Sequence, residues 1–216
     1  MGRKRLTQYF PCLLPLRRRQ RIFCFYLGMR LDRCRYAKTR WEEALPHTLF
    51  RDSWPVYHKE TGYDPVYQEN KAHNCALAAR AIDSLLIAPG ETFSFWNTVR
   101  FADRRTPYKK GFVLADGELQ FLYGGGLCQI SGFLYWLFLH TPLTVTERHR
   151  HGKELHLTAP EIPRGVDAAV AEGWLDLKVQ NDTPYTFQIQ IAVEDDRLTG
   201  AVLADAWMPP VDQRAG

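Results

Sequence analysis

The sequence has few cysteines and no apolar run near its N-terminus that is long enough to span a bilayer, and both features limit the class of protein. Its 216 residues include only five cysteines, with no C-x-x-C pair: Cys12, Cys24, Cys34, Cys75 and Cys128. An odd number of scattered cysteines argues against a disulfide framework and against a zinc knuckle. The apolar run IFCFYLGM at residues 22–29 is too short to span a bilayer, and no A-x-A-type cleavage site follows it. We therefore expect a reduced, cytoplasmic protein without a secretory signal.

Acidic residues are almost absent from the first forty positions. Residues 1–40 hold twelve Lys or Arg and one acid, Asp32, whereas the other 176 residues hold 16 bases and 23 acids, and the total is +4. This asymmetry predicts a basic N-terminal segment at 1–40 and a folded domain at 41–210. The partner that we consider for the basic segment is an anionic membrane surface, where each basic residue contributes roughly 1 kcal/mol. A solvated arm is the alternative, and no nucleic-acid partner is expected.

Internal repeats are also missing, and the hydrophobic periodicities indicate which segments are helical. Residues 74–87, NCALAARAIDSLLI, carry apolar side chains at helical spacing, with Asn74 as the N-cap and Pro89-Gly90 as the stop. Cys75 would lie on the buried face of this helix. A second helix is predicted at 127–140, and because it is apolar on nearly all sides it should be buried.

Strands are predicted where polar and apolar residues alternate. This alternation occurs at 92–95, 143–147, 175–179 and 187–193, and a further strand is predicted at 112–114. Turn residues between the later strands favour a β-meander. The predicted fold class is therefore α+β, with a buried central helix that starts at a glycine-rich turn and packs on an antiparallel sheet.

Three consecutive glycines stand directly before a lone thiol in YGGGLCQISGFLYW, residues 123–136. Glycines permit backbone conformations closed to other residues and let a ligand approach the main chain. The unpaired N–H groups and the dipole of a helix start favour a thiolate at Cys128 and an oxyanion beside it. A nucleophilic cysteine is one interpretation. The others are a small core residue after a tight turn and a phosphate nest, although the sequence has no P-loop motif.

A base for such a thiol is available about twenty residues downstream, in the segment TERHRH. On an extended strand His149 and His151 would point to one face. Arg148 would point to the other, where it could bind a carboxylate or pair with Glu147 or Asp167. A cysteine at a helix start with a histidine on a neighbouring strand is the arrangement that thiol enzymes use. A solvated strand edge is one alternative and a metal site from the thiol and both histidines is another. We expect no metal and no other cofactor.

Together these residues resemble the VanW family, bacterial proteins named from glycopeptide-resistance gene clusters. The resemblance covers nearly the whole chain. It rests on PGETFSF at 89–95, YGGGLCQ at 123–129, the pattern ERH-x-H that ends at His151, and Val166-Asp167-Ala168. Some secreted relatives in this family resemble L,D-transpeptidases that crosslink peptidoglycan through a cysteine.

The resemblance implies roles for individual residues. Cys128 would be the nucleophile and His151 the base, with His149 orienting or assisting it. Arg148 would bind a substrate carboxylate. The remaining residues expected to contact substrate are Gly125, Gly126 and Gln129.

The expected function is that of a glycopeptide-resistance accessory protein that acts on peptidoglycan stem peptides as a cysteine-dependent acyl transferase. Two alternatives stay open: a non-catalytic protein that recognises cell-wall precursors, and a membrane-surface adaptor driven by the basic segment. In the cytoplasm, or peripherally at the inner face of the membrane, the substrate would be an unlinked peptidoglycan precursor.

Overall fold

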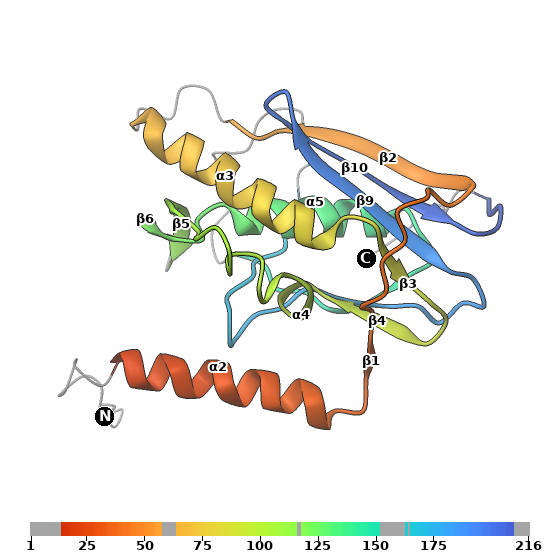
Figure 1. Cartoon of the computed structure of the whole chain (residues 1–216), viewed down its shortest axis with the longest axis horizontal. Helices are drawn as coiled ribbons and strands as arrows, with labels where there is room; N and C mark the ends of the chain where they lie inside the picture. Colours follow the sequence, from red (N-terminus) through yellow and green to blue (C-terminus); the bar gives the residue numbers. More distant parts are fainter. Residues whose placement is uncertain (1–13, 58–63, 116–117, 152–162, 164, 210–216) are drawn as a thin grey trace.

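The structure, a computed structural model, describes residues 14–57, 64–115, 118–151, 163 and 165–209. Figure 1 shows how helices and strands follow one another along the chain. The helices are α2 (Leu14–Leu31), α3 (Pro65–Ile82), α4 (Phe95–Val99) and α5 (Leu127–Leu139). The strands are β1 (Arg35–Tyr36), β2 (His47–Pro55), β3 (Leu85–Ile87), β4 (Glu91–Ser94), β5 (Lys110–Ala115), β6 (Glu118–Tyr123), β7 (Thr144–Glu147), β8 (Lys178–Gln180), β9 (Phe187–Glu194) and β10 (Arg197–Ala204).

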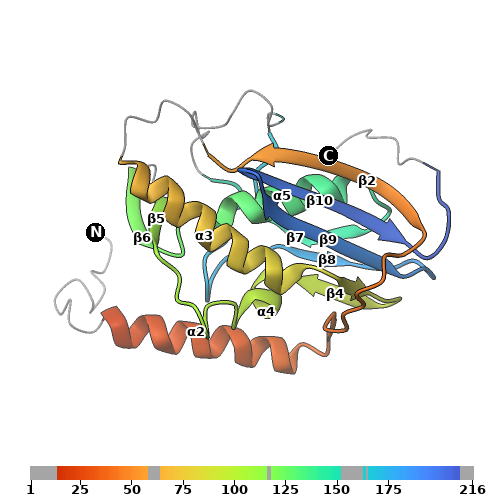
Figure 2. The same cartoon turned by 45° about the horizontal axis from the view of Figure 1, so that its top comes forward.

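The strands form two four-stranded sheets and one hairpin. One sheet has the order β2-β10-β9-β3 with antiparallel pairs throughout, and the other has the order β1-β4-β8-β7, in which only the short β1–β4 pair is parallel. The hairpin is β5-β6. Helices and mostly antiparallel strands are combined in one body (Figure 2), which confirms the predicted α+β class. The strands that follow α5 divide between the two sheets, because β8 pairs with β4 and β7 while β9 pairs with β10.

Helix α5 lies between the two sheets, as its apolar sequence predicts. Phe133 packs against Trp54 of β2 with ring centroids 5.1 Å apart, and Phe138 packs against Phe93 of β4 at 5.3 Å. Gly200 of β10 lies so close to α5 that a Cβ there would be 2.7 Å from the ring of Phe133. The predicted bounds of this helix are confirmed to within one residue. A central helix is therefore held from both sides by aromatic side chains.

Helix α3 differs from its predicted bounds at both ends. It begins at Pro65, nine residues before the predicted start, with the Asp64 side chain as its N-cap, and it ends at Ile82, so that the predicted last turn is strand β3. Asn74 is thus a buried residue in mid-helix, where its amide bonds the backbone of Lys109 and Gly125. The periodicity begins late because this turn of α3 uses polar side chains to hold the neighbouring chain. Cys75 is fully buried, as predicted.

Helix α2 lies along one edge of the molecule, with the rest of the described chain on only one side of it in both views (Figures 1 and 2). Two of its side chains, Tyr26 and Met29, are buried against the body, and the Tyr26 hydroxyl donates to Glu172 at 3.1 Å. Among the described residues, no helix has both the length and the apolar character that crossing a bilayer requires.

Candidate active site

The glycine triplet shapes the turn that starts α5. Gly124 and Gly126 have φ of +80° and +103°, a left-handed conformation that favours glycine. Gly125 meets a different constraint, because a Cβ there would lie 2.1 Å from the carbonyl carbon of Gly111. The amide of Asn74 donates to the carbonyl of Gly125 at 2.8 Å and so fixes the turn to α3. These contacts fix the first turn of α5 relative to α3 and to Gly111.

Cys128 is the second residue of α5 and is half-buried. Its thiol donates to the carbonyl oxygen of Val170 at 3.6 Å and is also a hydrogen-bond neighbour of the His151 imidazole. The sulfur is thus at a helix N-terminus, where the dipole stabilises negative charge, with a proton-carrying group beside it.

Asp167 completes a line of three side chains. Its Oδ1 lies 2.7 Å from Nδ1 of His151, and its Oδ2 accepts the backbone N–H of the same residue at 2.6 Å. The hydrogen bond that His151 donates to the Asp167 carboxylate, together with the one between His151 and Cys128, raises the pKa of His151 to about 10, although partial burial acts in the opposite direction. The same contact holds the pKa of Asp167 below its ordinary value against the effect of burial. His151 is therefore a cation at neutral pH, and Asp167 fixes the orientation of its ring.

Arg148 holds the two segments that carry His151 and Asp167 together. Its Nε donates to the backbone oxygen of Asp167 at 2.6 Å and a terminal nitrogen donates to that of Gly165 at 3.0 Å. Its guanidinium also lies over the ring of Tyr135, 4.4 Å from the centroid. The interaction with Asp167 thus uses the backbone of that residue, and two of the nitrogens that the sequence assigns to a substrate carboxylate already donate to protein oxygens.

Ser131 attaches the segment after Asp167 to α5. Its hydroxyl lies one helical turn beyond the thiol and contacts the backbone oxygens of Ala168 and Cys128. The N–H of Ala169 donates to the carbonyl of His149 at 2.8 Å. These hydrogen bonds hold residues 165–170 across the first turn of α5. Asp167 therefore lies next to His151.

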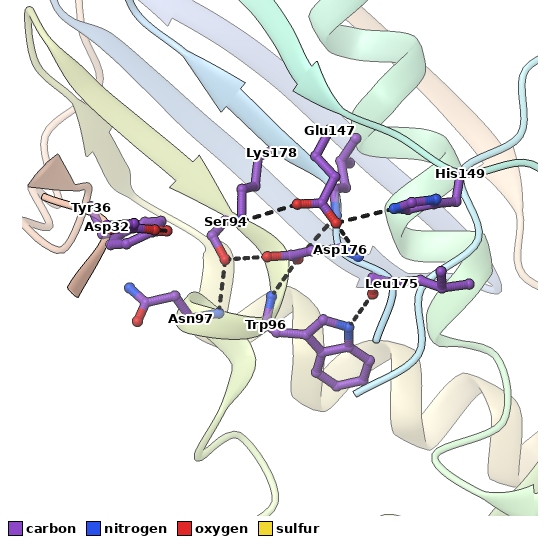
Figure 3. A network of polar contacts seen from close by, with 11 residues as sticks. Asp32, Tyr36, Ser94, Trp96, Asn97, Glu147, His149, Leu175, Asp176 and Lys178 are labelled. Atoms are coloured by element: carbon purple, nitrogen blue, oxygen red, sulfur yellow. Dashed lines mark hydrogen bonds and ion pairs between the residues drawn. The ribbon is translucent and has the colours of Figure 1, made fainter. Parts of the chain in front are cut away.

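His149 contacts a different group from His151. Strand β7 ends at Glu147, before either histidine, so the alternation that would place both rings on one face does not extend to them. The Nε2 of His149 lies 3.1 Å from Oε1 of Glu147, and Lys178 contacts the other oxygen of that carboxylate at 3.0 Å (Figure 3). Burial acts to raise the pKa of Glu147, but the hydrogen bonds from Lys178 and His149 hold it below its ordinary value.

A buried carboxylate, Asp176, continues this polar network toward α4. It accepts the hydroxyl of Ser94 at 2.6 Å and the backbone N–H of Trp96 at 3.1 Å, and its own N–H donates to Glu147 at 3.1 Å (Figure 3). Burial raises the pKa of Asp176 to about 6, against the effect of the hydrogen bonds from Ser94 and Trp96. Because Ser94 caps α4 and Glu147 ends β7, the network joins two strands and a helix and has a structural role.

Gln129 also binds protein, since its Nε2 donates to the carbonyl of Pro55 at 2.7 Å. Its Oε1 is buried without a hydrogen-bond partner among the described residues.

A metal site is one of the alternatives for Cys128 and the two histidines. Among the described residues, no group of three or more His, Cys, Asp or Glu side chains is arranged to hold a metal ion.

Comparison with known proteins identifies the family. The profile of the family described as "VanW like protein" matches residues 70–203, which include Cys128, His151 and Asp167. The chain belongs to the VanW family.

Two relatives show how far the VanW similarity extends. The vancomycin B-type resistance protein VanW of Enterococcus faecalis (strain ATCC 700802 / V583) is 52% identical over 206 residues, which cover 95% of this chain and 75% of that protein. The uncharacterized protein YoaR of Bacillus subtilis (strain 168) is 35% identical over 113 residues, which cover 52% of this chain and 36% of YoaR. No solved structure matches the chain.

The sequence alone gives Asp167 no role beside His151. Sixteen positions separate the two residues, and the contact between them depends on a chain crossing that no local pattern encodes. The available sign is the position of Asp167 in one of the VanW-like motifs, Val166-Asp167-Ala168.

Proposed function

We propose that this VanW-family chain serves glycopeptide resistance, as the name of its Enterococcus faecalis relative describes, and that it acts as a cysteine-dependent acyl transferase on peptidoglycan stem peptides. The observation that supports this proposal is the line Cys128–His151–Asp167, in which a thiol at a helix start has an oriented imidazole beside it. Nucleophile, proton carrier and orienting carboxylate are the three parts that covalent acyl transfer requires.

The first half-reaction forms a thioester. The Cys128 thiolate attacks the carbonyl carbon of a donor amide, the C–S bond forms, and the C–N bond breaks. His151 gives its proton to the leaving amine, a role that suits a group protonated at neutral pH. His151 therefore acts as an acid before it acts as a base.

The second half-reaction restores the enzyme. An acceptor amine attacks the thioester carbonyl, neutral His151 takes a proton from it, a new C–N bond forms, and the C–S bond breaks to leave the Cys128 thiolate. Asp167 keeps the same ring nitrogen of His151 occupied in both steps, so that the other nitrogen faces the reacting atoms.

The oxyanion in both steps needs hydrogen-bond donors near the sulfur. In the first turn of α5, the N–H of Leu127 points to Gly124 at 3.5 Å and that of Gln129 donates to Gly126 at 2.9 Å. The backbone N–H of Cys128 itself has no acceptor within the described chain. We assign this N–H as the main oxyanion donor, with the helix dipole adding to its effect.

The proposed substrate depends on the compartment that we expect for this protein. In the cytoplasm or at the inner face of the membrane, the available stem peptides are those of precursors that have not been crosslinked. A reaction on these would alter the stem peptide before it reaches the wall, which is a step at which glycopeptide binding can change.

The test is incubation with soluble precursor peptides followed by intact-mass measurement of the protein. A mass increase on the wild-type chain that Cys128→Ser abolishes, and that Cys34→Ser leaves in place, supports the proposal. Cys34 is the control because it is another free thiol in the described chain and, being exposed, it is at least as accessible as Cys128.

Two results would contradict it. Unchanged peptide processing by Cys128→Ala would remove the nucleophile from the mechanism. Peptide binding that survives Cys128→Ser, with no adduct on the wild type, would favour the non-catalytic alternative, in which the same residues recognise a precursor.

A further inference from the structure

Helix α2 is apolar on two opposite faces, and among the described residues only one of these faces packs on the rest of the chain. The inner face packs on the body through Tyr26 and Met29, which are 5% and 8% exposed. A Cβ at Gly173 would lie 3.0 Å from the side chain of Ile22, which shows how closely the body approaches this face. The inner face accounts for the attachment of α2 to the molecule.

The outer face carries a stripe of large exposed side chains. These side chains are spaced by seven, four and four residues, so they share one side of the helix. They are Leu16 at 65% exposed, Phe23 at 66%, Leu27 at 41% and Leu31 at 70%. Four large apolar residues in a row exceed what scattered surface positions give, and such a stripe marks an interaction surface.

The stripe lies between arginines. Helix α2 contains five arginines and no acidic residue, and all five are exposed: Arg17, Arg18, Arg19, Arg21 and Arg30. At 100° per residue, Arg19 and Arg30 lie on one side of the stripe and Arg17 and Arg21 on the other. The outer face of α2 therefore has an apolar centre and cationic edges.

Exposed aromatic side chains stand beside α2 and contact arginines. The Arg21 guanidinium lies 5.5 Å from the ring of Trp174, and that of Arg100 lies 3.8 Å from Tyr26 and 5.1 Å from Phe101. Trp174 and Phe101 are each 65% exposed. Tryptophan next to a cationic, apolar helix is typical of side chains at a membrane–water interface.

We propose that the outer face of α2 binds the surface of an anionic phospholipid bilayer, with the helix axis in the plane of the interface. The apolar stripe would enter the boundary between headgroups and acyl chains, and the arginines on both edges would bind lipid phosphates. This inference does not depend on the chemistry of Cys128.

The charge of α2 argues for lipid over a second copy of the chain. Pairing two α2 helices through their outer faces would bring ten arginines together without one acidic side chain in either helix, and like charges at such a contact repel. Phosphates of a bilayer supply the opposite charge along the whole length of the helix.

The experiment is sedimentation of the full chain with vesicles of 30% phosphatidylglycerol and 70% phosphatidylcholine, compared with pure phosphatidylcholine. We expect binding to the anionic vesicles that falls at 0.5 M NaCl. The double variant Phe23→Ser/Leu27→Ser should weaken binding to the anionic vesicles at least tenfold, because both substitutions remove an apolar side chain that would enter the bilayer. The matched control is Leu122→Ser/Trp207→Ser, which removes two exposed apolar side chains outside α2. Leu122 is 47% exposed and Trp207 is 72% exposed, and their loss should leave binding unchanged.

A second pair of variants separates local from overall charge. Arg19→Gln/Arg30→Gln should weaken partition about 30-fold. Arg51→Gln/Arg104→Gln makes the same net charge change at exposed positions off α2 and should have a small effect. Circular dichroism of each variant confirms that the fold is retained.

Three results would overturn the proposal. They are absence of binding to anionic vesicles, equal binding to neutral vesicles, and equal loss from the two arginine pairs. Analytical ultracentrifugation adds one more: a dimer that Phe23→Ser/Leu27→Ser abolishes, without vesicle binding, would assign the stripe to a second copy.

Discussion

Asp167 holds His151 at two points, because one carboxylate oxygen lies 2.7 Å from the ring nitrogen Nδ1 and the other accepts the backbone N–H at 2.6 Å. A ring fixed in this way cannot rotate away from Cys128 without breaking a charge-assisted hydrogen bond. Only 9% of the His151 side chain is exposed, so solvent competes weakly for this contact. The geometry of the candidate site therefore depends on a residue that itself does not touch the sulfur.

Asp167→Asn should lower the pKa of His151, since it removes the negative charge that favours the imidazolium. The expected fall is about 1–3 units. An NMR titration of the His151 ring protons measures it. Glu147→Gln is the matched control, because that carboxylate contacts His149, and it should leave the titration of His151 in place. An unchanged His151 titration in Asp167→Asn would show that the pair does not form in solution.

Because of the His151–Asp167 pair, the free energy of unfolding should fall as the pH rises into the alkaline range. The pKa of His151 is raised from 6.5 to about 10, so the protonated form is stabilised by folding. This contribution is complete below about pH 6.5 and is lost as the pH rises toward 10. Urea unfolding of wild type and Asp167→Asn at pH 6, 8 and 10 should show a difference in free energy that shrinks with pH. A constant or growing difference would contradict the assignment.

Gly125→Ala should destabilise the protein by about 3 kcal/mol, because the new methyl group would meet backbone atoms of Gly111, which cannot rotate away. Gly90→Ala is the comparison. Its φ is +74° but no atom lies within 4 Å of the added Cβ, so only backbone strain of about 1 kcal/mol is expected. Thermal unfolding of both variants measures the contrast, and equal losses would mean that the close approach of Gly125 is absent.

Lys71→Met should stabilise the fold. The Lys71 side chain is only 3% exposed and its ammonium has no hydrogen-bond partner among the described residues, and burial lowers its pKa to about 8. Because the pKa is lowered, the charged Lys71 ammonium reduces the free energy of unfolding below pH 8, and this penalty disappears toward pH 10.5. Lys71→Met should therefore raise the free energy of unfolding at pH 7 by about 3 kcal/mol.

Lys178→Met is the control for that change. Its ammonium binds Glu147 at 3.0 Å, so its loss should destabilise the protein. If Lys71→Met also destabilises it, the Lys71 ammonium has a partner in solution that offsets its burial.

Some elements follow from local pattern and others do not. The apolar run after the glycines predicts α5, because a helix of this length that is apolar on nearly all sides is expected to be buried. The first half of α3 is not visible as a periodic pattern because buried Gln68, Lys71 and Asn74 occupy positions that are normally apolar. Strand β2 is missed as well, since its burial depends on pairing with β10, about 150 residues later.

The candidate site divides in the same way. The nucleophile and its two possible imidazoles follow from residue type and spacing, but the choice between His149 and His151 does not. It depends on β7 ending at Glu147, and on residues 165–170 crossing α5 where Asp167 meets His151 and Ser131 meets Ala168.

By itself the sequence determined the α+β class, the buried helix behind the glycine turn, and the family, because each is written in local composition or in a short motif. Only the tertiary structure decided which histidine faces Cys128, which carboxylate orients it, and which apolar side of α2 is exposed among the described residues. These depend on contacts between segments far apart in the chain, and the energy of such contacts is fixed by packing and not by any one residue's neighbours in sequence.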